Sequence, residues 1–343
     1  MNFIWRSPSN IALVKYWGKH GRQLPRNASI SFTLSNAYSE TALELLPLQG
    51  DGGLSLSFLF EGVPNEAFER KLIKLLTGIS DIFPFLMQYH LKISSHNTFP
   101  HSAGIASSAS AMSALACCLC DAERHLMGTL QDGADFFQKA SFVSRLLSGS
   151  ACRSVFPVLG VWGKHDSING SSDEFAVPFE EVHPVYSTFH DDILIISADE
   201  KKVSSTAGHE LMNGNPFAPA RYEQAATNLA ELSVALKNGD LETFGRITEE
   251  EALTLHALMM TSQPSYILLE PQSLAAIDLI REFRFNTKVP LYFSIDAGPN
   301  LHLLYPHEHI GIVSKFIDEQ LRPLCQDGRI VKDIVGQGAI KVV

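Results

Sequence analysis

Apolar and polar residues alternate along much of the first part of the chain. Between residues 24 and 34, apolar side chains alternate with hydroxyl-bearing ones, and this period of two predicts a strand. The same pattern predicts strands over 41–46 and 54–60, with a glycine-rich turn at 50–53 between them. Pro8 predicts the end of an earlier extended segment. The opening part of the chain is therefore expected to be rich in β-structure.

Helical periodicity begins after this region. Apolar residues spaced three and four apart predict helices over 65–76 and 133–147. Strands are also predicted over 91–95 and 158–162. The stretch 97–120 changes from a polar half with proline and glycine to a half of small and apolar residues, which is typical of a loop that runs into a buried helix.

A boundary between two units is expected at 184–190, before a strongly apolar segment. Strands and helices follow one another in a mixed order on both sides of it, which favours an α+β fold in two or three layers. The second unit is predicted to contain strands at 192–198, 291–295 and 301–305, and helices at 220–238, 241–260, 273–283 and 310–321.

The composition fits a soluble globular protein. The chain has 343 residues, of which 45% are hydrophobic and 19% charged, enough for one large or two medium domains. We expect no membrane helix and no secretory signal, since no long apolar run and no basic, apolar and small-residue leader is present. The five cysteines lack zinc spacing, and three of them lie in the predicted helix at 117–120. They indicate core packing in a reducing cytoplasm.

The net charge of −10 argues against general nucleic-acid binding, which requires a basic face. An anionic substrate would therefore need a local basic pocket that works against the field of the whole molecule.

The start of the predicted helix after residue 104 has two interpretations. Small residues let a ligand approach the backbone, free N–H groups at a helix start favour an anion such as phosphate, and Ser107, Ser108 and Ser110 add hydroxyl donors. A capped and tightly packed helix explains the same composition.

Polar loops follow apolar elements at 15–21, 99–110, 148–154 and 296–300. Together they contain cations, hydroxyls, glycines and one carboxylate, a set suited to binding phosphates and moving one proton. The chain has no Walker A lysine motif, no Gly-x-Gly-x-x-Gly run and no Gly-x-Ser-x-Gly elbow. A P-loop, Rossmann or hydrolase site is therefore disfavoured.

These loops resemble the signature segments of the diphosphomevalonate decarboxylases, a family of the GHMP kinase superfamily. Lys-Tyr-Trp-Gly-Lys at 15–19 and Ser-Gly-Ser-Ala-Cys-Arg at 148–153 are the most specific of them. The chain departs from the family at His101–Ser102, in the nucleotide loop. The matching segments are, in chain order, 10–19, 24–29, 99–109, 148–153, 203–206 and 296–300.

The resemblance implies a two-domain GHMP kinase fold with the active site in the cleft between the domains. The N-terminal ATP-binding domain, like a ribosomal-protein domain, would span 1–188. A ferredoxin-like α+β domain would span 189–343, with about the last twenty residues packing back on the first domain.

The implied reaction is ATP-dependent decarboxylation of (R)-5-diphosphomevalonate to isopentenyl diphosphate, a step of the mevalonate pathway of isoprenoid biosynthesis. ATP would phosphorylate the 3-hydroxyl, and phosphate and CO2 would then leave. Asp296 would position or deprotonate the hydroxyl. Lys15 would keep this carboxylate ionised, and Arg153 would bind the substrate carboxylate.

The resemblance also implies the binding residues, the cofactor and the assembly. ATP would bind with Mg²⁺, and the protein would be a cytoplasmic homodimer that acts on a small molecule. The nucleotide phosphates would contact Gly104, Ala106, Ser107 and Ser108, with the two serines also near Mg²⁺. The substrate would contact Tyr16, Trp17, Gly18, Lys19, Arg70, Ser148, Gly149, Ser150, Ala151, Cys152, Arg153, Ser205 and Thr206.

Other interpretations remain open at this point. The chain could be a decarboxylase of phosphomevalonate, or a GHMP small-molecule kinase that phosphorylates without decarboxylation. A non-catalytic binding protein on the same fold is a further alternative, which the presence of Lys15 and Asp296 disfavours. No histidine is expected to be catalytic, and His101 is the only one placed by the predicted site, where exposure to solvent is expected for it.

Overall fold

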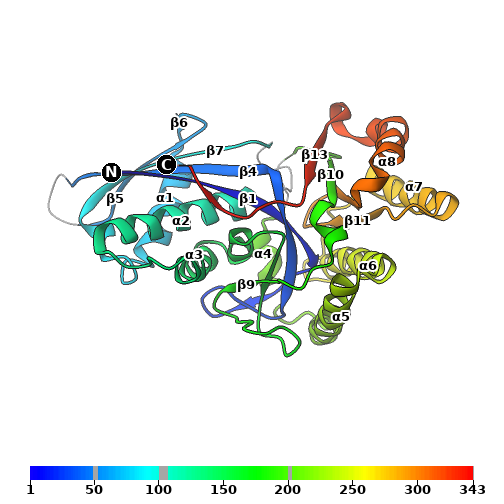
Figure 1. Ribbon diagram of the computed structural model, residues 1–343, viewed down its shortest axis with the longest axis horizontal. Helices are drawn as coiled ribbons and strands as arrows, with labels where there is room; N and C mark the ends of the chain where they lie inside the picture. The colour runs from blue at the N-terminus through cyan, green and yellow to red at the C-terminus, as the bar shows by residue number, and fades with distance from the viewer. Residues whose placement is uncertain (49–52, 100–106, 200–202, 343) are drawn as a thin grey trace.

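The computed structural model describes residues 1–48, 53–99, 107–199 and 203–342. It has two parts set side by side, each with a β-sheet covered by helices (Figure 1). The two termini lie close together at the far end of the first part (Figure 1). This arrangement confirms the predicted α+β fold.

The first part is built on a sheet in the order β14-β1-β4-β7-β5-β6, to which β8 and β9 are added beside β4. A separate pair, β2 and β3, forms a short hairpin. The strands are β1 (Asn2–Val14), β2 (Lys19–His20), β3 (Leu24–Pro25), β4 (Ser29–Pro47), β5 (Ser55–Phe60), β6 (Val63–Pro64), β7 (Tyr89–Asn97), β8 (Leu159–Trp162), β9 (Ala176–Pro178) and β14 (Ile340–Lys341).

Two predictions about these strands are wrong. Pro8 does not end an extended segment, because β1 continues through it to Val14. The register between β1 and β4 shifts between Pro8 and Asn10, and such an irregularity accommodates a residue without an N–H donor. The strands predicted at 24–34 and 41–46 are not separate, because residues 29–34 and 41–46 both belong to the single long strand β4, while residues 24–25 form β3.

The predicted strand at 54–60 is confirmed as β5, but it does not pair with β4. β7 lies between them, antiparallel to β4 and parallel to β5. The predicted turn at 50–53 lies mostly on residues 49–52, which are outside the described part of the chain. The predicted strand at 91–95 is the centre of β7.

Three predicted helices cover one face of this sheet: α1 (Glu66–Thr77), α2 (Ser107–Met127) and α3 (Gly133–Leu147). They lie together below the sheet in Figure 1. α2 is buried along most of its length, and Cys117, Cys118 and Cys120 are fully buried without disulfides. This confirms that the cysteine cluster packs in the core.

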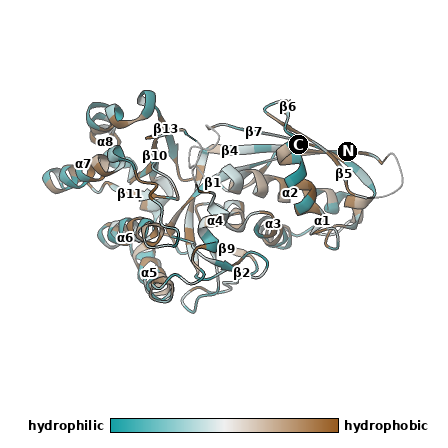
Figure 2. Ribbon diagram, turned by 180° about the vertical axis from the view of Figure 1, so that it is seen from behind, coloured by the Kyte–Doolittle hydropathy of each residue, from teal (hydrophilic) through white to brown (hydrophobic). Residues whose placement is uncertain are grey.

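The second part has a four-stranded antiparallel sheet in the order β11-β12-β10-β13. The predicted pair of strands around the turn at 296–300 is confirmed as β11 and β12. The helices of this part carry both polar and apolar residues, as Figure 2 shows for α5 and α7. The elements are β10 (His190–Leu194), β11 (Tyr292–Ile295), β12 (Leu301–Tyr305), β13 (Ile330–Ile334), α4 (Ser205–Glu210), α5 (Ala218–Asn238), α6 (Leu241–Met260), α7 (Pro271–Thr287) and α8 (Ile310–Phe316).

The two parts share a hydrophobic core. Ile11 and Phe32 of the first sheet pack in one buried cluster with Phe189, Leu229 and Phe244 of the second part. Burial of apolar side chains across the junction stabilises one relative orientation of the two sheets. The boundary at residue 188 therefore stays a prediction, since the core continues across it.

The C-terminal segment returns to the first part. Asp333 accepts hydrogen bonds from the N–H groups of Ser35, Asn36 and Ala37. Beyond it, β14 pairs antiparallel with β1 at residues 340–341. These contacts hold the second sheet against the first, and they fix the position of the space between them.

Within the described ranges, no helix is both long and apolar enough to cross a bilayer.

Candidate active site

A cleft of about 500 Å³ lies between the two parts of the molecule. Its walls come from the loop after β1, the inner side of α1, the start of α2, the turn at 148–153, α4 and the turn after β11. The residues that line it are Ala12, Lys15, Tyr16, Trp17, Lys19, Gln23, Phe68, Lys71, Lys74, Leu75, Ser108, Met112, Leu147, Ser148, Gly149, Ser150, Arg153, Ser205, Thr206, His209, Leu255, Asp296 and Ala297.

An ion pair between the two sheets lies in this cleft. The Lys15 Nζ atom donates to Asp296 Oδ1 at 2.8 Å and to Ser294 Oγ at 2.7 Å. The Lys15 side chain is 2% exposed, whereas that of Asp296 is 27% exposed. Burial lowers the pKa of Lys15, and the Asp296 carboxylate opposes this effect. The cleft therefore presents a carboxylate whose far side is backed by a buried ammonium group.

The backbone of Lys15 is fixed by a second, fully buried ion pair. Glu251 Oε2 accepts from the Lys15 N–H at 2.8 Å, and Arg221 donates to the Lys15 carbonyl at 3.1 Å. Arg221 and Glu251 pair with each other, with side chains 1% and 0% exposed. The Asn27 amide adds a bond to the same carbonyl at 2.9 Å. Lys15 is thus held by α5 and α6 as well as by its own strand.

Arg153 reaches the cleft from a short 3-10 helix, Gly149–Val155. Its guanidinium donates to Ser29 Oγ and, at 3.4 Å, to Asn10 Oδ1. The Asn10 amide in turn donates to Ser154 Oγ at 2.7 Å. Burial lowers the pKa of Arg153, but an arginine stays charged in a protein. The cleft therefore contains an oriented, desolvated cation suited to a carboxylate.

The loop after β1 is held by aromatic stacking. The Tyr16 ring lies 4.6 Å from that of Trp162 and 4.4 Å from the imidazole of His209. The Trp17 ring lies 4.5 Å from the same imidazole. Gly18 has φ +96°, where a side chain would be strained, and its N–H donates to His209 Nδ1 at 2.9 Å. This loop has one fixed shape in the cleft wall.

Cations line the cleft on more than one element. Lys19, which follows β1, is one of them, and partial burial lowers its pKa. Lys71 and Lys74 of α1 line the cleft as well. The local basic pocket that an anionic ligand requires in this acidic protein is therefore present.

Arg70 is not brought into this pocket. Its side chain is 71% exposed and forms a surface ion pair with Glu66. Since neighbouring helix residues point in different directions, Lys71 and Lys74 face the cleft in its place. Arg70 is therefore a surface residue, and the cleft lining does not support its predicted contact with the substrate.

The other predicted residues fall into three groups: those that line the cleft, those that are buried away from it, and those outside the described residues. Ser148, Gly149, Ser150, Ser205 and Thr206 line the cleft together with Lys15, Arg153 and Asp296. Ala151 and Cys152 are fully buried and do not line it. Gly104 and Ala106, together with His101 and Ser102, lie outside the described residues.

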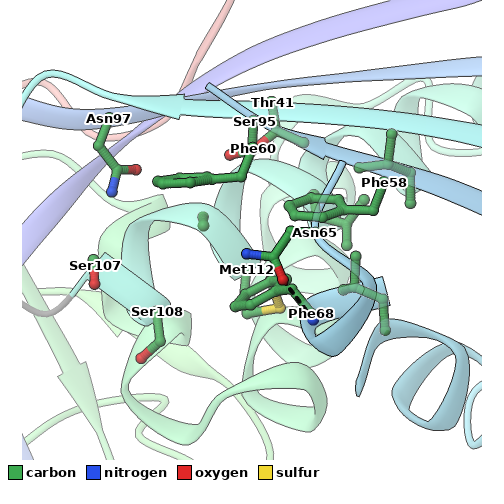
Figure 3. A pocket seen from close by; sticks show the side chains of 14 residues that line it. Thr41, Phe58, Phe60, Asn65, Phe68, Ser95, Asn97, Ser107, Ser108 and Met112 are labelled. Carbon is green, nitrogen blue, oxygen red and sulfur yellow. Dashed lines mark hydrogen bonds between the residues drawn. The ribbon is translucent and has the colours of Figure 1, made fainter. Parts of the chain in front are cut away.

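Ser107 and Ser108 begin α2 and line an apolar cavity together with the rings of Phe58, Phe60 and Phe68 (Figure 3). Ser108 lines both this cavity and the cleft. The start of α2 therefore connects an apolar chamber to the charged cleft. The labelled residues around the cavity in Figure 3 are Thr41, Phe58, Phe60, Asn65, Phe68, Ser95, Asn97, Ser107, Ser108 and Met112.

Several residues that build the site were not found from the sequence. Glu251 and Arg221 lie within long helices and carry no local signal, and Ser294 lies inside an apolar strand. His101 is the only histidine expected by the site, and His209 and His256 were not found from the sequence. His209 lines the cleft, and His256 Nε2 bonds the Asp296 carbonyl at 3.1 Å.

We expect Glu251→Gln to lower the free energy of unfolding by about 3 kcal/mol, because it leaves the Arg221 charge buried without its partner. Urea unfolding followed by circular dichroism measures this change. Glu250→Gln is the matched control, since the Glu250 side chain is 40% exposed and should change stability by less than about 1 kcal/mol. Equal stability of the two variants would contradict the role given to the buried pair.

Comparison with known proteins agrees with this geometry. Residues 7–176 match the diphosphomevalonate decarboxylase-like N-terminal domain, and residues 192–337 match the mevalonate 5-diphosphate decarboxylase C-terminal domain. The chain is 31% identical to a diphosphomevalonate decarboxylase of Ganoderma lucidum, over 91% of this chain and 80% of that protein.

Solved structures give the same result for the fold. Mevalonate diphosphate decarboxylase from Staphylococcus aureus superposes with a TM-score of 0.85 at 29% identity, covering 100% of this chain and 98% of that one. A structure described as MDDEF in complex with MVAPP, AMPPCP and magnesium superposes with a TM-score of 0.83 at 28% identity, covering 99% and 98%. The chain therefore belongs to the diphosphomevalonate decarboxylase family and has the GHMP kinase fold of that family.

Proposed function

We propose that the cleft catalyses the ATP-dependent decarboxylation of (R)-5-diphosphomevalonate to isopentenyl diphosphate, in the mevalonate pathway. The observation that carries this proposal is the Lys15–Asp296 pair, with its carboxylate facing a cleft that Arg153 also lines. This reaction requires a protein carboxylate that acts on the substrate hydroxyl and a protein cation that binds the substrate carboxylate.

Asp296 acts on the tertiary 3-hydroxyl of the substrate. A tertiary alcohol is a poor nucleophile, so a carboxylate within hydrogen-bond reach is needed to orient it or to accept its proton. Lys15 favours the ionised carboxylate, and its ammonium adds positive charge where the transferred phosphoryl group becomes negative. The hydroxyl oxygen bonds to the γ-phosphorus of ATP, and ADP leaves with the electron pair of the broken P–O bond.

Decarboxylation follows from the phosphorylated intermediate. The C3–O bond breaks, and its electron pair leaves with phosphate. The bond between C2 and the carboxylate carbon then supplies the pair that forms the new double bond, so that CO2 departs. Arg153 binds and orients the carboxylate before the bond breaks, with its own position fixed by Ser29 and Asn10.

The diphosphate of the substrate is bound at the Lys19 end of the cleft. Lys19 supplies a positive charge there, and the Tyr16, Trp17 and Gly18 loop fixes the position from which it acts. Further hydrogen-bond donors are provided by backbone and hydroxyl groups of Ser148, Gly149, Ser150, Ser205 and Thr206.

ATP fits the apolar cavity and the start of α2. The aromatic cavity offers a surface for the purine ring, and Ser107 and Ser108 line it (Figure 3). Ser108 also lines the cleft that contains Asp296. Hydroxyl oxygens suit Mg²⁺, which is usually held by few protein ligands and by nucleotide phosphates. Ser107 and Ser108 would hold the ion with ATP, and its charge would stabilise the phosphates. The relative solved with AMPPCP and magnesium supports binding of ATP and Mg²⁺.

We also propose a homodimer in the cytoplasm. All five cysteines are buried and unpaired, which suits a reducing compartment. Decarboxylation of phosphomevalonate, and phosphorylation without decarboxylation, are the alternatives to the proposed reaction.

Purified protein given ATP, Mg²⁺ and diphosphomevalonate should release CO2, ADP and phosphate in equal amounts. Radiometric CO2 and coupled ADP assays measure the ratio, with the monophosphate substrate tested in parallel. ADP without CO2 would contradict decarboxylation and leave a kinase. Preference for the monophosphate would identify the phosphomevalonate enzyme.

Asp296→Asn should lower kcat by about 100-fold or more, because an amide does not accept the hydroxyl proton, while substrate binding persists. Steady-state kinetics and calorimetric titration with diphosphomevalonate measure the two effects. Asp192→Asn is the matched control, since Asp192 is a buried carboxylate of the same sheet that does not line the cleft. A variant at Asp296 that keeps most of its turnover would show that another group acts on the hydroxyl.

A further inference from the structure

His209 is a buried imidazole in the wall of the cleft, outside the residues that carry the reaction above. It lies on α4 and is 8% exposed, with its ring between those of Tyr16 and Trp17. A methyl group added at Gly208 would come within 2.6 Å of the Trp17 ring, so α4 packs directly on the loop after β1. The position of the imidazole is therefore fixed before a ligand binds.

The hydrogen bond to Gly18 determines the tautomer of His209. A backbone N–H can only donate, so the Nδ1 atom that it contacts at 2.9 Å is the acceptor. Burial lowers the pKa of His209 to about 3, and the charges of Lys19 and Arg153 act in the same direction. The ring is therefore neutral at physiological pH, and its proton is on Nε2.

The Nε2–H group has no acceptor among the residues that the structure describes. Gly18 is the one hydrogen-bond partner of this side chain there, and His209 lines the cleft beside Thr206, one helical turn earlier. Nε2 is not among the fully buried polar atoms that lack a partner, so this donor is exposed to the cleft, where a ligand oxygen can accept its hydrogen bond.

We propose that the Nε2–H of His209 donates a hydrogen bond to a diphosphate oxygen of the substrate, on the wall of the cleft that carries the Gly18 loop and Lys19. This inference rests on the proposed function, because it assigns a binding group to the same substrate. A neutral donor at this position acts differently from a further cation. A cation would attract every anion, whereas a neutral N–H group selects an oxygen that lies in the direction of its hydrogen bond. His209 is thus a binding and specificity residue that also positions the Gly18 N–H.

Two amide variants separate these two contacts. In His209→Asn the amide oxygen takes the place of Nδ1 and keeps the Gly18 bond, but no donor reaches the Nε2 position. In His209→Gln the amide nitrogen reaches the Nε2 position, and the acceptor for Gly18 is lost. Steady-state CO2 release gives kcat, KM for diphosphomevalonate and KM for ATP for each protein.

We expect His209→Asn to raise KM for diphosphomevalonate by about tenfold or more, with KM for ATP unchanged and a smaller effect on kcat. His209→Gln should stay within about threefold of the unchanged protein in KM for diphosphomevalonate. An unchanged KM in His209→Asn would overturn the proposal. Equal losses in both variants would also overturn it, because the Gly18 contact would then explain the effect.

Binding of inorganic diphosphate distinguishes this inference from the proposed reaction. Calorimetric titration of the unchanged protein and both variants needs no turnover. Weaker binding in His209→Asn alone supports the donor even if no CO2 is released, in which case only the reaction would be wrong. Identical binding by all three proteins would overturn the donor, whatever the reaction.

Discussion

The structure depends on the ion pair between Lys15 and Asp296, because it joins the two sheets at the point where the chemistry is proposed. Lys15 directly follows β1 of the first sheet, and Asp296 directly follows β11 of the second sheet. A buried ammonium is unfavourable unless its partner is close, so the two sheets must meet in one orientation for the pair to form. The same requirement leaves one side of the carboxylate open to the cleft.

The rest of the fold maintains this orientation. Three features hold the two sheets together. They are the core shared across the junction, the pairing of β14 with β1, and the Arg221–Glu251 pair behind Lys15. Aromatic stacking then extends the fixed region from Tyr16 to α4. The cations of the cleft are consequently preorganised, as electrostatic stabilisation of a transferred phosphoryl group requires.

The sequence predicted most helices and the chemistry of the site, but not its supports. Helices such as α3 and α6 follow their apolar periodicity, and the Lys15, Arg153 and Asp296 loops carry a family resemblance. The length of β4 and the position of β5 depend on long-range pairing, which has no local signal. Glu251 and Ser294 acquire their roles only when distant segments meet at Lys15. Arg70 shows the converse, since a shift of one residue along α1 turns a side chain from the cleft to solvent.

The central claim is that Lys15 and Asp296 act as one unit, and a double-mutant cycle on turnover tests it most directly. kcat is measured for Lys15→Met, Asp296→Asn and the double variant under identical conditions. If the pair is one unit, kcat of the double variant should be no more than about threefold lower than kcat of the less active single variant. Losses that multiply would show that the two residues act independently and would contradict this account.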